Sequence, residues 1–187
     1  MTPAAHFRIA IRRRWLTRLI GGLLAIGSVA AAPPTQADSV AEYRLKAAYL
    51  FNFATFTEWP DSIGNTLTLC IYGDDPFGAD LDALTRQTLG NRRIAVRRTV
   101  SAENLAGCQL VFVTRPMIGN LSRVFDRLGT APTLVVADSP GALQNGAMLN
   151  MDRVDGKVSF SANLAAARRQ NLNLSAKLLR LATEVIQ

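Results

Sequence analysis

Two short runs of apolar residues constrain the fold of this chain more than any other feature. Segments 108–114 (CQLVFVT) and 132–138 (PTLVVAD) show almost no alternation of apolar and polar residues. Strands with this pattern are buried on both faces, as the strands of parallel sheets are. A third run, 66–73 (TLTLCIYG), ends at a Gly-Asp-Asp-Pro turn, which cannot continue a strand. The three runs are therefore predicted to be the central strands of a largely parallel sheet.

Helical patterns separate these strands. Apolar residues recur at helical spacing over 116–129, and a shorter helix is predicted over 78–90, where Gly90 ends it. The alternation predicts a single-domain, open α/β sheet that is mainly parallel, with about five strands and with helices on both faces. Right-handed crossovers and the strand order 2-1-3-4-5 are the expected topology.

The flanking segments complete the predicted sheet. Residues 92–100 alternate in polarity and are predicted to form an edge strand. Residues 147–162 predict a hairpin around Asp155-Gly156. The C-terminal residues 163–186 are predicted to be helical in two halves, interrupted at Asn171 or Asn173.

The first 37 residues have the pattern of an export signal. Five arginines precede the apolar run 19–32, and small residues precede Asp38. This arrangement predicts a secretory signal peptide over 1–37, cleaved near Ala37, and a mature domain over 38–187. A retained membrane anchor is the less favoured alternative, because a membrane-spanning helix needs about 20 apolar residues.

Removing the predicted signal changes what the charge implies. The whole chain has a net charge of +7, with 21 basic and 14 acidic residues. The signal contains five of the arginines and no acidic residue, so the mature chain has a net charge of only +2. A nucleic-acid partner is therefore not expected.

The mature chain has no histidine, since His6 lies in the signal. This excludes histidine-based acid–base catalysis, Ser-His-Asp arrangements and histidine-ligated metals. Phosphate-binding loops and other common catalytic motifs are also absent. Catalytic residues, cofactors and metal ligands are accordingly not predicted.

Cys70 and Cys108 are the only cysteines and both lie in the mature chain. In an oxidising compartment such a pair is most simply a disulfide. Cys70 lies in one predicted strand and Cys108 begins the strand expected beside it, within the distance that a disulfide spans. Closing this loop contributes roughly 4 kcal/mol in the chain-entropy model. A reducible, regulatory disulfide and a pair of free thiols are the alternatives.

Two polar segments are further candidates. Asp74, Asp75, Pro76 and Phe77 follow a central strand at its carboxyl end, where open α/β sheets bind ligands. The interpretation as an ordinary turn, without a ligand-binding role, is favoured. The arginine cluster within 92–98 is interpreted as a charged sheet edge that prevents association, with acidic lipids or an acidic partner as the alternative.

Several motifs together resemble one family. The segment 42–60 (EYRLKAAYLFNFATFTEWP) is similar to the N-terminal hallmark of the YfiR family of exported proteins. The resemblance continues in the same order through further motifs, namely CIYGDDPFG, GCQLVFV, PTLVVADSPG, NGAMLNM and GKVSFSANLAAARRQNLNLSAKLLRLA. It covers nearly the whole mature chain.

The resemblance implies a periplasmic regulator and not an enzyme. Family members restrain a membrane-bound diguanylate cyclase by binding its periplasmic domain, and so control cyclic-di-GMP signalling and biofilm formation. An outer-membrane lipoprotein and a second copy of the chain are further implied partners. Cys70 and Cys108 match a family cysteine pair that is redox-sensitive in some members. A second pair found in some relatives, near 143–150, is absent here, which places redox switching through that pair in doubt.

The hallmark segment contains more aromatic side chains than one buried helix face requires. Ala47, Leu50, Ala54 and the interleaved Phe51 can cover the sheet, while Phe53, Phe56 and Trp59 fall partly on another face. The surplus is either a second internal contact, which is favoured, or a docking or dimer surface. The candidate docking residues are Phe51, Phe53, Phe56, Trp59, Phe160 and Leu172.

Three classes of function follow. The first is an exported regulatory protein that acts by protein–protein docking. The second is a periplasmic sensor that binds a small molecule in the crevice at Asp74–Phe77. The third, an enzyme, is disfavoured because the mature chain offers no histidine and no nucleophile arrangement.

Overall fold

The computed structural model describes residues 36–187. The predicted signal peptide, residues 1–37, lies outside the described residues apart from its last two positions, which belong to the first helix. None of the helices from Gln36 onward is long and apolar enough to cross a membrane. The predicted cleavage near Ala37 stays a prediction.

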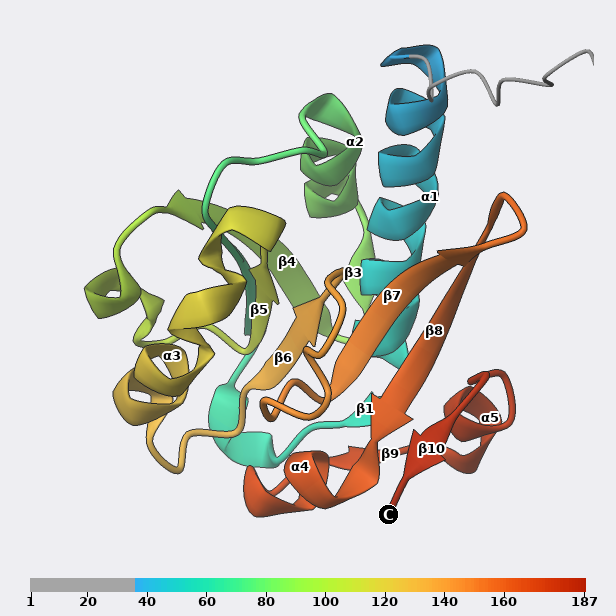
Figure 1. The fold of residues 1–187 in the computed structure, drawn as a ribbon. Helices are drawn as coiled ribbons and strands as arrows, with labels where there is room; N and C mark the ends of the chain where they lie inside the picture. Colours follow the sequence, from blue (N-terminus) through green and yellow to red (C-terminus); the bar gives the residue numbers. More distant parts are fainter. Residues whose placement is uncertain (1–35) are drawn as a thin grey trace, which may run out of the picture. The chain divides into compact units, whose positions relative to one another are not determined.

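A mixed sheet of eight strands forms the centre of residues 36–187 (Figure 1). Five strands run parallel in the spatial order β4-β2-β5-β6-β7, which is the predicted order 2-1-3-4-5. The prediction of an open, mainly parallel α/β sheet is thus confirmed. The parallel strands are β2 (Thr66–Tyr72), β4 (Arg92–Thr99), β5 (Leu110–Val113), β6 (Leu134–Ala137) and β7 (Leu149–Val154).

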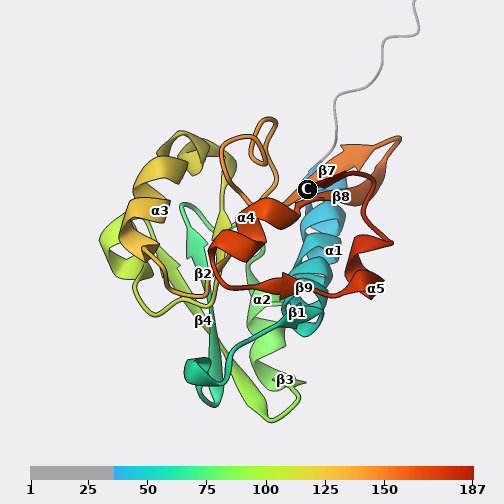
Figure 2. The ribbon, with the colours of Figure 1, turned by 90° about the horizontal axis from the view of Figure 1, so that it is seen from below.

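Two of these strands contain the unbroken apolar runs noted in the sequence. All residues of β5 and β6 are buried, because helices cover both faces of the sheet at this point. Helix α1 (Gln36–Thr55) and the short α2 (Ala79–Asp82) cover one face, and α3 (Leu121–Leu128) covers the other (Figures 1 and 2).

Short strands extend the sheet on both sides. The antiparallel β3 (Thr88–Leu89) pairs only with the first two residues of β4. Along the rest of β4 the outer side has no partner strand in the described part of the chain, as expected for an edge. On the opposite side β8 (Lys157–Asn163) pairs with β7, and β10 (Val185–Ile186) pairs with β8.

The predicted hairpin is the β7–β8 pair. Its two turn residues, Asp155 and Gly156, have φ angles of 49° and 77°. Positive values at both central positions are typical of the type I′ turn, whose twist matches that of the flanking strands. The sequence Asp-Gly therefore sets the register of this hairpin.

The predicted helices are shorter than expected. The segment 78–90 contains α2, a 3-10 turn over Ala83–Arg86 and β3, and residues 115–120 form a 3-10 helix before α3. The prediction for 163–186 was largely wrong. Only α4 (Leu164–Arg169) and α5 (Ala176–Leu179) are α-helical there, separated by β9 (Asn173–Leu174).

Tertiary pairing explains the C-terminal difference. Asn171 has a φ of 54°, which ends α4 near the predicted interruption. The next residues pair with β1 (Thr57–Glu58), directly after α1, in a separate two-stranded sheet. The last residues become β10 because β8 offers a free edge. Strand pairing with distant segments overrides local helical propensity here.

Candidate functional site

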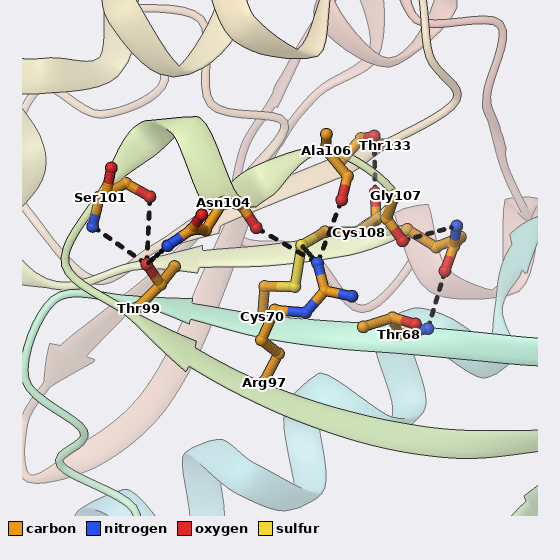
Figure 3. The surroundings of a disulfide bond; sticks show 11 residues. Thr68, Cys70, Arg97, Thr99, Ser101, Asn104, Ala106, Gly107, Cys108 and Thr133 are labelled. Carbon is orange, nitrogen blue, oxygen red and sulfur yellow. Dashed lines mark hydrogen bonds between the residues drawn. A yellow bond between two sulfur atoms is a disulfide. The ribbon is translucent and has the colours of Figure 1, made fainter.

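The predicted disulfide is present. Cys70 lies in β2 and Cys108 lies two residues before β5, with their Cα atoms 5.9 Å apart. Both residues are buried. The two neighbouring strands bring the cysteines together at this distance, which is typical of disulfides. The sulfur bridge therefore joins the first strand of the sheet to its neighbour (Figure 3).

Polar contacts surround the disulfide (Figure 3). The Gln109 amide bridges Thr68 N, at 2.8 Å, and Gly107 O, at 3.1 Å. The Thr133 hydroxyl donates to Cys108 O at 2.9 Å. These contacts fix the chain on both sides of Cys108 independently of the sulfur bridge.

Arg97 of β4 lies against the disulfide. Its Nη1 donates to Asn104 O at 3.2 Å and to Ala106 O at 3.1 Å, and lies 3.8 Å from Cys108 Sγ. The guanidinium therefore fastens the loop before Cys108 to the edge strand.

The hallmark segment 42–60 continues beyond the end of α1 at Thr55 and includes β1. Ala47, Leu50, Phe53 and Ala54 are buried on the inner face of the helix. The predicted placement of Phe51 and Phe53 was wrong, because Phe53 is fully buried and Phe51 only half-buried. The Phe53 ring packs against Phe160 with their centroids 5.0 Å apart. The inner face of the helix is therefore a core contact with β8.

The candidate docking residues divide into two groups. Phe53, Phe160 and Leu172 are at most 2% exposed; their placement matches the internal-contact alternative, because side chains without exposed surface cannot meet a partner in this conformation. Phe51, Phe56 and Trp59 are half-buried at the end of α1 and just after it. We call these last three residues the aromatic rim.

The aromatic rim is held in place by polar contacts. Trp59 Nε1 donates to Ala54 O at 2.8 Å. The Lys177 ammonium lies 5.0 Å from the centre of the Phe56 ring, and Ser175 N donates to Phe56 O at 2.9 Å. Its Phe56 and Trp59 side chains thus have fixed positions while part of their surface remains accessible.

The candidate crevice residues at the carboxyl end of β2 make contacts within the protein. Asp75 accepts a hydrogen bond from Phe77 N at 2.7 Å and pairs with Arg98 at 2.6 Å. Phe77 is buried, with its ring 4.9 Å from that of Phe112. A Cβ at Gly73 would lie 2.0 Å from Thr114 Oγ1. This arrangement matches the turn interpretation.

Arg98, one of the arginines clustered within 92–98, forms ion pairs inside the protein. Its guanidinium also pairs with Asp82 at 2.8 Å. The hydrogen bond that Arg98 donates to Asp75, followed by the one it donates to Asp82, raises the pKa of Arg98. Arg92 donates to Gly64 O, so three of the four arginines of this edge have intramolecular partners.

Sequence reasoning missed a buried ionic cluster. Lys46 on α1 is fully buried, and its Nζ lies 2.6 Å from Asp138 Oδ2 and 2.5 Å from Glu42 Oε1. Asp138 directly follows β6 and also accepts a hydrogen bond from the Tyr43 hydroxyl at 2.9 Å. The available signal was a lone lysine at the start of an uncharged run, four residues after an acid.

The cluster shifts the ionisation of its members. Burial alone would raise the pKa of Glu42, but the Lys46 hydrogen bond and charge, aided by Arg153, lower it below its ordinary value. Burial, and then the charge of Asp138, raise the pKa of Tyr43. Lys46 and Asp138 thus hold α1 against the carboxyl edge of the sheet as a paired, hydrogen-bonded unit.

These features define a class of protein: an α/β domain with flavodoxin-like strand order, which one disulfide crosslinks. Within residues 36–187, acidic and cysteine side chains do not gather in a group that could hold a metal ion.

Residues 43–183 match the YfiR/HmsC-like family, so the chain belongs to that family. No curated protein matches the chain. Among solved structures it is similar to a conserved domain protein from Vibrio cholerae (TM-score 0.51, 9% identity, 76% of this chain and 60% of that one). It is also similar to an ABC domain in complex with L-Trp from Streptococcus pneumoniae (TM-score 0.50, 8% identity, 77% and 60%). The chain spans about three fifths of each of these proteins, and at such low identity the likeness concerns the fold alone.

Proposed function

We propose that this chain is an exported regulator that restrains a membrane-bound diguanylate cyclase by docking on its periplasmic domain. Release of the docked chain would raise cyclic-di-GMP and promote biofilm formation. The observation that carries the proposal is the family match over residues 43–183. Family membership suggests a periplasmic regulator of a diguanylate cyclase, and the cyclase is the partner that follows from it.

The geometry supports a docking role in two ways. At the position where related sheets hold ligands, Phe77 is buried and Asp75 pairs with Arg98, so these two residues serve contacts within the protein. The aromatic rim keeps partly exposed, positionally fixed rings at one end of α1. Aromatic residues of this kind are enriched in protein–protein interfaces.

Direct binding tests this proposal. The mature domain, residues 38–187, is immobilised and the detergent-solubilised cyclase is passed over it under oxidising and reducing conditions. Saturable capture of the cyclase is the expected result. The Trp59→Ala variant should weaken capture, whereas Val100→Ala, which truncates an apolar side chain that is 65% exposed outside the rim, should not. Capture that is absent for the unmodified domain would refute the proposal.

Two further partners belong to the same proposal. An outer-membrane lipoprotein would compete with the cyclase for the regulator, and a second copy of the chain would form a homodimer. Sedimentation of the mature domain at micromolar concentration measures homodimer formation directly. Addition of the purified lipoprotein to the captured cyclase complex tests the competition, which would be observed as release of the cyclase.

A further inference from the structure

A cleft lies between α3, the loop before β7 and α4. Its volume is about 520 Å³, which is within the range of small-molecule sites. Six polar or aromatic residues line it: Ser122, Phe125, Gln144, Asn145, Arg169 and Gln170. It does not include the residues of the turn at the end of β2, nor those of the aromatic rim.

The topology explains why this space exists. In an α/β sheet of this kind a crossover between parallel neighbours usually contains a helix that covers the sheet. The connection from β6 to β7, residues 138–148, contains only turns. The sheet is therefore covered less deeply between α3 and α4, and the cleft occupies the position that a crossover helix would otherwise fill.

Hydrogen bonds hold the walls of the cleft in place. Asn163 donates to Leu143 O at 3.0 Å and accepts from Ala166 N at 2.8 Å, which ties the loop to the start of α4. Gln170 Nε2 donates to Gly129 O at 2.9 Å, which ties the end of α4 to the end of α3. The cleft is thus formed without a ligand, as most small-molecule sites are.

Two groups in the walls lack complementary partners. The Gln170 side chain is buried, and its Oε1 accepts no hydrogen bond from any described residue. This atom is itself shielded from solvent, so a ligand in the cleft does not reach it in this conformation. Arg169 is exposed and forms no ion pair with residues 36–187. The lining residues include no acid, so the charge of the cleft is positive.

We propose that this cleft binds a small hydroxylated carboxylate of the sugar-acid class. The carboxylate pairs with the Arg169 guanidinium in a charge-assisted contact. Ligand hydroxyls exchange hydrogen bonds with the amides of Gln144 and Asn145. The half-buried Phe125 ring supplies apolar contact to a sugar face. The proposal is independent of docking on a cyclase.

Calorimetric titration of the mature domain with D-glucuronate tests this site, with D-glucose and acetate as comparison ligands. Glucuronate is expected to bind at least tenfold more tightly than either, because glucose lacks the carboxylate and acetate lacks the hydroxyls. Absence of saturable glucuronate binding, or equal binding of all three ligands, would overturn the proposal. Either result would leave the docking proposal untouched.

Matched variants locate the ligand. Arg169→Gln should weaken glucuronate binding about tenfold, which is the loss typical of one charge-assisted hydrogen bond. Arg168→Gln, the adjacent exposed arginine that does not line the cleft, should leave affinity unchanged. Ser122→Trp places a large side chain at an exposed lining position and should abolish binding while the thermal midpoint is retained. Equal effects of the two arginine variants, or unchanged affinity in Ser122→Trp, would contradict the assignment.

Discussion

Replacing Lys46 by methionine tests the buried ionic cluster. Methionine has a similar length and packs in apolar surroundings, so the substitution removes the charge and leaves little empty space. Asp138, whose side chain is 1% exposed, then loses its contact with the lysine at 2.6 Å. Glu42 loses its contact at 2.5 Å. One buried carboxylate and one partly exposed carboxylate are left without their shared cation.

The structure limits the size of the effect. Breaking a buried ion pair by removing one partner destabilises proteins by about 3–5 kcal/mol. Asp138 keeps the Tyr43 hydroxyl at 2.9 Å and Arg115 at 3.5 Å, and Glu42 keeps Arg153 at 3.3 Å. These remaining partners favour the lower end of that range. We therefore expect Lys46→Met to lower the free energy of unfolding by about 3 kcal/mol.

Urea unfolding followed by tryptophan fluorescence measures this change, because Trp59 is the only tryptophan of the mature chain. Arg44→Met is the matched control on the same helix. Its side chain is 70% exposed and pairs with Asp80 at 3.3 Å, so its effect should stay below about 1 kcal/mol. A Lys46→Met variant within about 1 kcal/mol of the unmodified domain, or a control with an equal loss, would refute the reasoning.

Four other outcomes follow from the structure. The destabilisation by Lys46→Met should shrink in acid. The lowered pKa of Glu42 gives stability that is present above its ordinary pKa of 4.5 and lost as pH falls below it. Unfolding of both proteins at pH 7 and pH 3.5 measures the change, and an equal stability difference at the two pH values would contradict it. Phe53→Ser should lower the free energy of unfolding by about 3–5 kcal/mol, whereas Trp59→Ala should change the thermal midpoint far less; equal midpoints would argue against a core role for Phe53. Replacing both cysteines by serine should remove roughly 4 kcal/mol, measured by urea unfolding without reductant, and an unchanged midpoint would show that the sulfur bridge does not constrain the unfolded chain. Gly156→Ala should cost about 1–2 kcal/mol, because an L side chain is strained at a φ of 77°; a stabilised variant in the same assay would contradict the type I′ turn.

Much of the fold could be predicted because local sequence and tertiary position agree. The runs in β5 and β6 are apolar throughout since both of their faces are covered. The Asp-Gly pair at 155–156 has few alternatives to a tight hairpin turn. Cys70 and Cys108 lie in adjacent segments of a parallel sheet, so their pairing followed from the predicted strand order.

The remaining features depend on contacts between segments that are distant in the sequence. The residues of β9 and β10 have a helical pattern, but they become strands because β1 and β8 provide partners. The aromatic excess of α1 could not be divided between core and surface from spacing alone. The placement of Phe160 opposite Phe53 determines which rings are internal. The ionic cluster was missed because Lys46 and Asp138 are separated by 92 positions.

That separation has a consequence for the order in which the domain can assemble. A chain that emerges with its N-terminus first presents α1 long before Asp138 is available. Until that carboxylate arrives, the Lys46 ammonium has to remain hydrated, and the inner face of the helix cannot close over the sheet. Helix α1 is therefore among the last elements of residues 36–187 to pack fully against the sheet, and its apolar inner face stays exposed until then.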